Sequence, residues 1–185
     1  MTPLSDNEIM ESVKDGNIEK LAILFERHHV SLYNFFLRMT GASNISEDLV
    51  QEVFLRVLKY RKSYQGRSKF RVWLFQIARN AHIDFLRKKK DAFPLEDQFF
   101  DVKSDEAEPE DSMIRNQEAA KLNRALSRLP LKKREVLILS RYQDMKYKEI
   151  ADLFGCQIGT VKTHVHRALK DLSKIYFEVN GGLAS

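Results

Sequence analysis

The sequence predicts an all-α protein made of two small domains of four helices each, joined by an acidic flexible linker. Apolar residues recur at three- and four-residue steps along most of the 185-residue chain, and no stretch alternates apolar and polar residues between turn signals. Hydrophobic residues make up 43% of the chain, which is typical of folded proteins. Since one domain usually takes about 150 residues, this length accommodates two small ones.

The first domain, residues 1–90, begins with two expected helices. The apolar spacing of residues 9–13 predicts a short helix, and that of residues 18–39 predicts a long one. Gly16 and Gly41 follow these patterns directly. Glycine adopts the left-handed backbone conformation easily, so we expect both helices to end at these residues.

Two more helices complete the first domain. The third is expected to begin with a cap at Asn44 or Ser46 and to run to about Lys59, because hydroxyl and amide side chains satisfy free amides at helix starts. Apolar residues recur at helical steps after Phe70, so the fourth helix should extend from there to about Lys90.

The second domain, residues 113–178, follows the linker of residues 91–112. Two prolines and a net charge of −8 predict that the linker is extended, because like charges repel and proline cannot continue a helix. Helical spacing resumes over residues 114–129, and Pro130 should start a helix that runs to about Tyr142. Two further helices follow.

Charge is segregated along the chain, and this matters more than the total of +5. The net charge is −5 over residues 1–55, +11 over 56–90 and +7 over 113–185. A basic run is often only a solvated face. Residues 60–73, however, interleave aromatic rings with cations, which adds stacking surfaces to charges that pair with phosphates. The combination favours a nucleic acid as partner.

Residues 147–169 have the pattern of a helix-turn-helix. Gly155 permits a left-handed turn between two helices, and Val161, Val165, Ala168 and Leu169 fall on one side of the second. The other side carries polar residues suited to a major groove, namely Lys162, Thr163, His164, His166 and Arg167. An ordinary helical hairpin is the alternative.

Several classes of protein are not expected. No apolar run is long enough to cross a bilayer and residues 1–16 lack the features of a signal peptide, so we expect a cytoplasmic protein. The single Cys156 excludes an intrachain disulfide, and no histidine pair has the spacing of metal ligands on one helix. We expect no catalytic residues, no metal, no cofactor and no enzymatic activity.

Three stretches resemble one known family. Residues 46–57 (SEDLVQEVFLRV) are similar to the helix by which extracytoplasmic-function sigma factors bind RNA polymerase, and residues 70–88, beginning FRVWLFQIARN, resemble the helix with which they melt and read the −10 promoter element. Residues 129–168 resemble their −35-reading domain. The resemblance implies a bacterial alternative sigma factor that directs promoter-specific initiation by core RNA polymerase.

The resemblance also implies site residues. Polymerase binding falls on the third helix, at Asp48, Gln51, Glu52, Leu55 and Arg56. The −10 element is assigned to a flipped-base pocket in the loop of residues 63–69 and to the following helix, at Ser63, Tyr64, Lys69, Arg71, Arg79, Asn80, Arg87 and Lys88. The −35 element is assigned to the five polar residues of the second helix of the helix-turn-helix.

The implied partners are core RNA polymerase, promoter DNA and an anti-sigma factor, with no membrane insertion by the chain itself. Two other functions stay open. A stand-alone helix-turn-helix regulator would account for residues 130–175 but not for the block of residues 46–90. A sigma mimic that only binds an anti-sigma factor would have no need of the basic face that Arg79, Lys162 and Arg167 provide.

Overall fold

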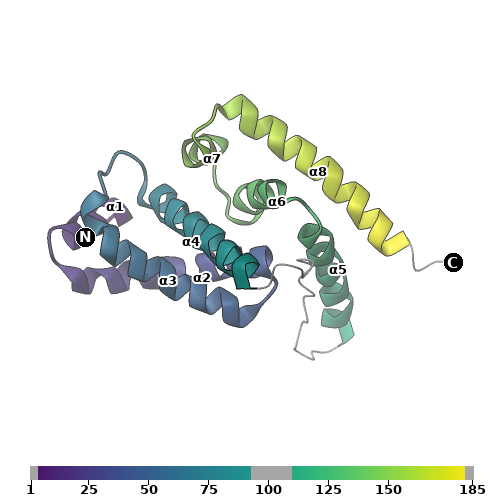
Figure 1. The fold of residues 1–185 in the computed structure, drawn as a ribbon, viewed down its shortest axis with the longest axis horizontal. Coiled ribbons are helices and arrows are strands. Elements are labelled where there is room, and N and C mark those ends of the chain that lie inside the picture. Colours follow the sequence, from purple (N-terminus) through teal and green to yellow (C-terminus); the bar gives the residue numbers. More distant parts are fainter. Residues whose placement is uncertain (1–3, 93–109, 182–185) are drawn as a thin grey trace.

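The computed structural model describes residues 4–92 and 110–181, and every regular element within these ranges is helical (Figure 1). The first part of the chain forms four α-helices with two short 3₁₀ turns between them: α1 (Asp6–Lys14), η1 (Ile18–Lys20), α2 (Leu21–Thr40), α3 (Ser43–Tyr60), η2 (Arg61–Ser63) and α4 (Phe70–Ala92). The predicted all-α class and the four helices of this part are confirmed.

The starts and ends of α1 and α2 follow from local chemistry. The carboxylate of Glu8 accepts from the amide of Ser5 at 2.7 Å, and the Ser5 hydroxyl accepts from the amide of Glu8, so two free amides at the start of α1 are satisfied. At the C-terminal end of α2, Gly41 has a φ of 71°, the left-handed conformation that ends a helix. The predicted stop at Gly41 is confirmed.

The predicted cap of α3 is wrong. The helix begins at Ser43, and the capping residue is Ala42, which has no side chain that could accept a hydrogen bond. Ser46 is instead fully buried in the first turn, where its hydroxyl donates to the main-chain oxygen of Ala42 at 2.6 Å. The reason is that the pattern shows which residues are able to cap, whereas the packing of this turn against Thr40 decides where the helix starts.

Helices α2, α3 and α4 pack around a core of aromatic and aliphatic side chains. Phe35 of α2 meets Phe75 of α4 edge to face, with ring centroids 5.4 Å apart. His82 of α4 lies in the same core, 3% exposed and next to Phe36. Burial, reinforced by the charge of Arg134, lowers the pKa of His82 to about 4, so the imidazole is neutral at pH 7.

This buried histidine makes stability depend on pH. Below pH 6.5 the unfolded chain binds a proton on His82, whereas the folded chain does not bind it until about pH 4. The free energy of unfolding therefore decreases as the pH is lowered across this window. We expect the free energy of unfolding in urea to drop by about 2 kcal/mol between pH 7 and pH 5 from this residue alone. A His82→Leu variant should lose that part of the drop, and equal pH dependence in both proteins would contradict it.

The second part of the chain forms four α-helices, with a π-helical segment, η3, after the second. The elements are α5 (Glu110–Ser127), α6 (Leu131–Leu137), η3 (Ile138–Tyr142), α7 (Tyr147–Phe154) and α8 (Ile158–Gly181). Pro130 is the capping residue before α6, as its position predicts. Both ends of the predicted linker are helical, since α4 reaches Ala92 and α5 begins at Glu110. Residues 93–109 lie outside the described residues.

Helices α7 and α8 form the predicted helix-turn-helix. Gly155 joins them with a φ of 62°, and Val161, Val165 and Ala168 are buried on the inner side of α8. Leu169, in the same sector, is 38% exposed.

The turn at Gly155 should be sensitive to substitution for a purely backbone reason. A Cβ at this position would meet no atom within 4 Å, so Gly155→Ala is strained only by its positive φ. We expect it to lower the free energy of unfolding by about 1–2 kcal/mol. Gly159→Ala is the control, because it lies within α8, also has open space around it, and should leave stability unchanged or raise it by up to about 1 kcal/mol.

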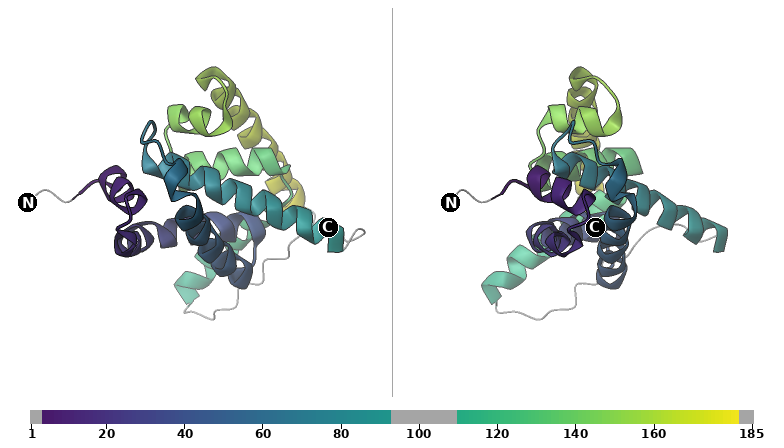
Figure 2. Two further views of the ribbon diagram at one scale, coloured as in Figure 1. Left: turned by 60° about the vertical axis from the view of Figure 1, so that its left-hand side comes forward. Right: turned by 90° about the vertical axis from the view of Figure 1, so that its left-hand side faces the viewer.

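The two helical domains lie against each other. Helix α4 packs beside α7, and α2 packs beside α5 and η3 (Figure 2). None of the helices in residues 4–92 and 110–181 is both long and apolar enough to cross a membrane.

Candidate nucleic-acid and polymerase interfaces

The outward side of α8 carries all five residues predicted to read the −35 element. Lys162, Thr163, His164, His166 and Arg167 are exposed, and Val161 and Val165 anchor the helix beneath them. The hydroxyl of Thr163 donates to the main-chain oxygen of Gly159 at 3.0 Å. In Figure 1, α8 runs along one side of the second domain.

Not all of the residues predicted to contact the −10 element are exposed to a DNA strand. Tyr64 is 1% exposed and packs edge to face on Trp73, with ring centroids 5.2 Å apart. Burial raises the pKa of its hydroxyl to about 12. The expectation that Tyr64 contacts a base is therefore wrong, because its ring would have to leave the core. Trp73 is half-buried and packs against the same core.

The other residues of the predicted −10 set fall into two groups. The first group, formed by Ser63, Asn80, Arg87 and Lys88, is exposed. Within it, the Ser63 hydroxyl donates to the main-chain oxygen of Tyr60 at 2.7 Å, and Arg87 pairs with Asp84 at 3.1 Å. The second group consists of Lys69, Arg71 and Arg79.

This second group contacts the other domain. Lys69 Nζ lies 2.8 Å from an oxygen of Glu149, and Arg79 Nε lies 2.9 Å from Glu135 Oε1. Arg71 Nη2 donates to the main-chain oxygen of Gln143. Three cations assigned to DNA are thus held by acceptors from the second domain.

The predicted polymerase-binding residues lie together on the outer side of α3. Asp48, Gln51 and Leu55 are exposed, Leu55 by 63%, whereas Glu52 and Arg56 are half-buried. Arg56 bridges two helices, with Nε 2.6 Å from Glu52 on α3 and Nη1 2.8 Å from Asp84 on α4. The bond from Arg56 holds the pKa of the Asp84 carboxyl below its usual value.

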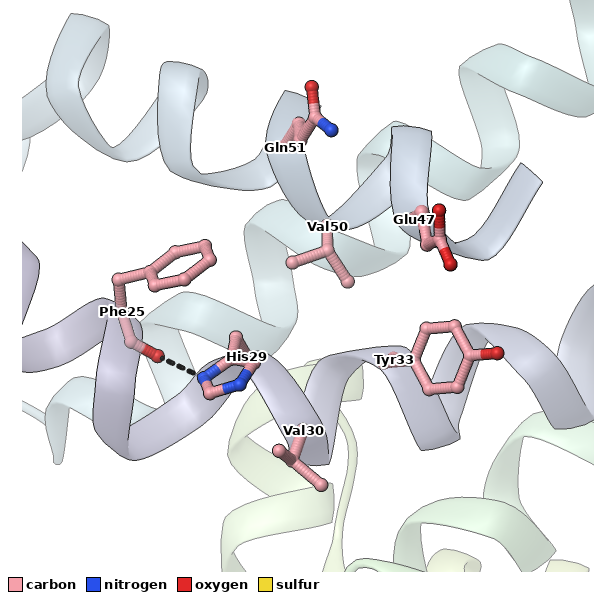
Figure 3. Close-up of a pocket in the computed structure, with 7 residues that line it drawn as sticks. All are labelled: Phe25, His29, Val30, Tyr33, Glu47, Val50 and Gln51. Carbon is pink, nitrogen blue, oxygen red and sulfur yellow. Dashed lines mark hydrogen bonds between the residues drawn. The ribbon is translucent and has the colours of Figure 1, made fainter. Parts of the chain in front are cut away.

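An apolar hollow of about 280 Å³ lies beside this patch, between α2 and α3 (Figure 3). Its floor includes a stacked pair, Phe25 and His29, whose ring centroids are 4.9 Å apart. The His29 ring bonds through Nδ1 to the main-chain oxygen of Phe25 at 3.0 Å. The lining residues are Phe25, His29, Val30, Tyr33, Glu47, Val50 and Gln51. Through Gln51 the hollow adjoins the predicted polymerase-binding patch.

Sequence reasoning missed three buried polar residues of the second domain. Arg134, Glu135 and Gln143 are 8%, 5% and 4% exposed. Arg134 donates through Nη1 to the main-chain oxygen of Met39 in the first domain at 2.9 Å, and Gln143 exchanges hydrogen bonds with Ser31. The available signal was the Arg134–Glu135 pair, which stands in the apolar register of the helix predicted after Pro130.

Comparison with known proteins places this geometry in a family. The family model for sigma-70 region 2 matches residues 24–92, and that for sigma-70 region 4 matches residues 119–172. The chain is 32% identical over 163 residues to the ECF RNA polymerase sigma factor SigX of Bacillus subtilis, covering 84% of this chain and 83% of that protein. The chain belongs to the extracytoplasmic-function sigma factors.

A second relative and a solved structure are also similar to this chain. The ECF RNA polymerase sigma factor SigW of Bacillus subtilis is 29% identical over 174 residues, covering 89% of this chain and 93% of its own. The sigma factor RpoE of Bartonella quintana, solved with the anti-sigma factor NepR, has a TM-score of 0.68 at 24% identity, covering 83% of this chain and 94% of its own. The region 2 match runs from within α2 to the end of α4, and the region 4 match includes α7 and the first part of α8.

Proposed function

We propose that this sigma factor reads the −35 element with α8 and the −10 element with the loop before α4 and the exposed cations of that helix. The observation that carries the proposal is the polar face of α8, where five exposed side chains lie over buried valines. A helix of this kind fits a major groove, where lysine and arginine reach base edges and phosphates. The remaining −10 residues are Ser63, Lys69, Arg71, Arg79, Asn80, Arg87 and Lys88.

The outer side of α3 is the proposed contact with core RNA polymerase. Leu55 supplies an exposed apolar centre, and Asp48, Gln51, Glu52 and Arg56 supply polar groups around it. Interfaces commonly have this arrangement of an apolar centre and a polar rim. The chain would add no chemistry of its own and need no cofactor or metal, since bond formation belongs to the polymerase, and it would act in the cytoplasm with that enzyme.

The test is run-off transcription with purified core polymerase on promoter libraries. We expect specific transcripts only when the chain is present, and no transcription would contradict the proposal. A gel shift with the free chain separates the main alternative, because tight specific binding to duplex DNA without polymerase would instead indicate a stand-alone regulator.

Leu55→Asp should weaken polymerase binding without unfolding the chain. The side chain is 63% exposed, so a charge there costs the fold little, but it places an ion in the centre of the proposed interface. We expect the dissociation constant for core polymerase, measured by fluorescence anisotropy, to rise about 10–100-fold. Leu4→Asp, at a 48% exposed position, is the control. Equal affinity of the two variants would place the interface elsewhere.

An anti-sigma factor is the proposed regulatory partner. RpoE of Bartonella quintana, which has the same fold, is described in complex with one. The sigma-mimic alternative would need only this partner, but α8 keeps its basic face, which favours DNA reading. Co-purification from cells should recover an inhibitor, and full activity under all growth conditions with no co-purifying protein would count against it.

A further inference from the structure

The contact between the two domains uses cations that the proposed −10 surface also needs. We define the interdomain clasp as Lys69, Arg71 and Arg79 of the first domain with Glu149, Gln143 and Glu135 of the second. The loop before α4 supplies Lys69, α4 supplies both arginines, and α6, α7 and the segment after η3 supply the acceptors. Figure 2 shows α4 and α7 side by side at this contact.

We infer that the interdomain clasp masks the two arginines of the −10 surface, Arg71 and Arg79, in the free chain while the −35 face of α8 stays accessible. The inference rests on the proposed role of Arg71 and Arg79 in holding the −10 strand. It adds a closed state, in which the second domain occupies the place of DNA.

The competition follows from hydrogen-bond chemistry. Phosphates and carboxylates both accept charge-assisted hydrogen bonds from guanidinium and ammonium groups, so Glu135 and Glu149 satisfy the donors that a DNA backbone would use. Arg79 is enclosed further, because its guanidinium also lies 4.7 Å from the centre of the Phe154 ring. Its side chain is 22% exposed and that of Glu135 is 6% exposed. A strand reaches Arg79 only after the two domains separate.

The clasp is built to separate. Glu135 and Arg134 are charged groups placed out of water, and removing charges from water offsets much of the attraction between them and their partners. Burial raises the pKa of the Glu135 carboxyl despite its pairing with Arg79, and burial lowers the pKa of Arg134. Separation rehydrates Glu135, which lowers the free energy that the polymerase needs to supply to open the chain. Interfaces between domains of one chain commonly move in this way.

The clasp covers residues of the −10 surface but not the −35 face of α8, so binding through α8 is an internal control. Lys162, Thr163, His164, His166 and Arg167 are exposed while the clasp is closed. Binding to duplex DNA through α8 should therefore be indifferent to the clasp, whereas binding of single-stranded DNA to the first domain should require opening.

Small-angle X-ray scattering of the free chain tests the closure without DNA. Arg79→Glu and Glu135→Arg each place like charges opposite one another, and we expect each to increase the radius of gyration. The two together restore opposite charges and should return the radius toward the wild-type value. Circular dichroism verifies that each variant keeps its helices. Because Glu135 is buried, Arg79→Glu keeps the test valid if Glu135→Arg fails to fold.

Binding of a fluorescent random 20-nucleotide single strand tests the masking. Glu135→Gln with Glu149→Gln weakens the clasp while keeping side-chain shape, and the amide oxygen introduced at position 149 can still accept from the start of α7. We expect this pair to bind the strand about tenfold more tightly than the wild type, since apparent affinity scales with the open fraction. Asp152→Asn with Glu178→Gln is the matched control, because it removes the same charge from exposed positions of the second domain.

The outcomes separate this inference from the proposed function. An unchanged radius of gyration in Arg79→Glu would overturn the clasp and leave the sigma-factor sites intact. An increased radius without tighter single-strand binding would overturn the assignment of the −10 surface, and with it the masking. Equal affinities for the test pair and the matched control would show that overall charge alone sets the binding, which also overturns the masking. A random duplex should bind the two pairs equally.

Discussion

Holoenzyme that carries Lys162→Ala together with Arg167→Ala is expected to lose protection of the −35 element in a footprint while polymerase binding is retained. Both side chains lie on the exposed side of α8, so the fold is preserved. Each lost base contact costs about 1–3 kcal/mol, so the loss of two together reduces the affinity for the −35 element by about two to four orders of magnitude.

The salt dependence of this pair gives a second measure. Each lysine or arginine that pairs with a phosphate adds about 0.9 to the slope of log affinity against log salt, so the pair should lower the slope by up to about 2. The control is Lys121→Ala with Lys174→Ala, which removes the same charge from the second domain. Lys121 lies on α5, and Lys174 lies on α8 beyond the five residues proposed to read DNA. A normal −35 footprint from the Lys162 and Arg167 variant would contradict the assignment of −35 reading to α8.

The second large effect concerns the −10 element, where we expect one group of residues to set the preferred bases and another to bind the strand. The loop is fixed at its C-terminal end, since Asn7 Oδ1 accepts from the Phe70 amide at 2.7 Å and Asn7 Nδ2 donates to the main-chain oxygen of Ser68 at 3.3 Å. Gln65 and Arg67, which precede this anchored end, are exposed. Replacing these two residues, with Tyr64 and Gly66 kept, should change the preferred bases, because loops change shape without disturbing the core.

Arg71→Ala and Arg79→Ala should instead weaken promoter opening on every sequence by a similar factor. Contacts to phosphates carry no sequence information, so we expect a loss of about 10–100-fold for each variant across a randomised −10 library. Opening is followed by permanganate reactivity of unpaired thymines in the holoenzyme complex. If the loop variants lower opening uniformly while the arginine variants shift the preferred sequence, the two roles are reversed.

Much of the fold was predictable because helices leave local signals. Apolar spacing and the glycines at 16, 41 and 155 predicted the helices and their ends, and the same spacing predicted which side of α8 faces solvent. The start of α3 was not predictable, because the capping residue is Ala42, which has no side chain able to cap, and packing decides where the helix begins. The exposure of Leu169 was not predictable either, since burial depends on how much surface the neighbouring helices cover.

The candidate sites divide along the same line. By itself the sequence determined the all-α class, the helix-turn-helix and the exposed basic face of α8, because residues a few positions apart decide a helix and its faces. Only the tertiary structure decided that Tyr64 lies in the core against Phe70 and Trp73, and that Lys69 and Arg79 meet Glu149 and Glu135. Those partners are 80 and 56 residues apart, and no local period records a contact that depends on how two domains pack.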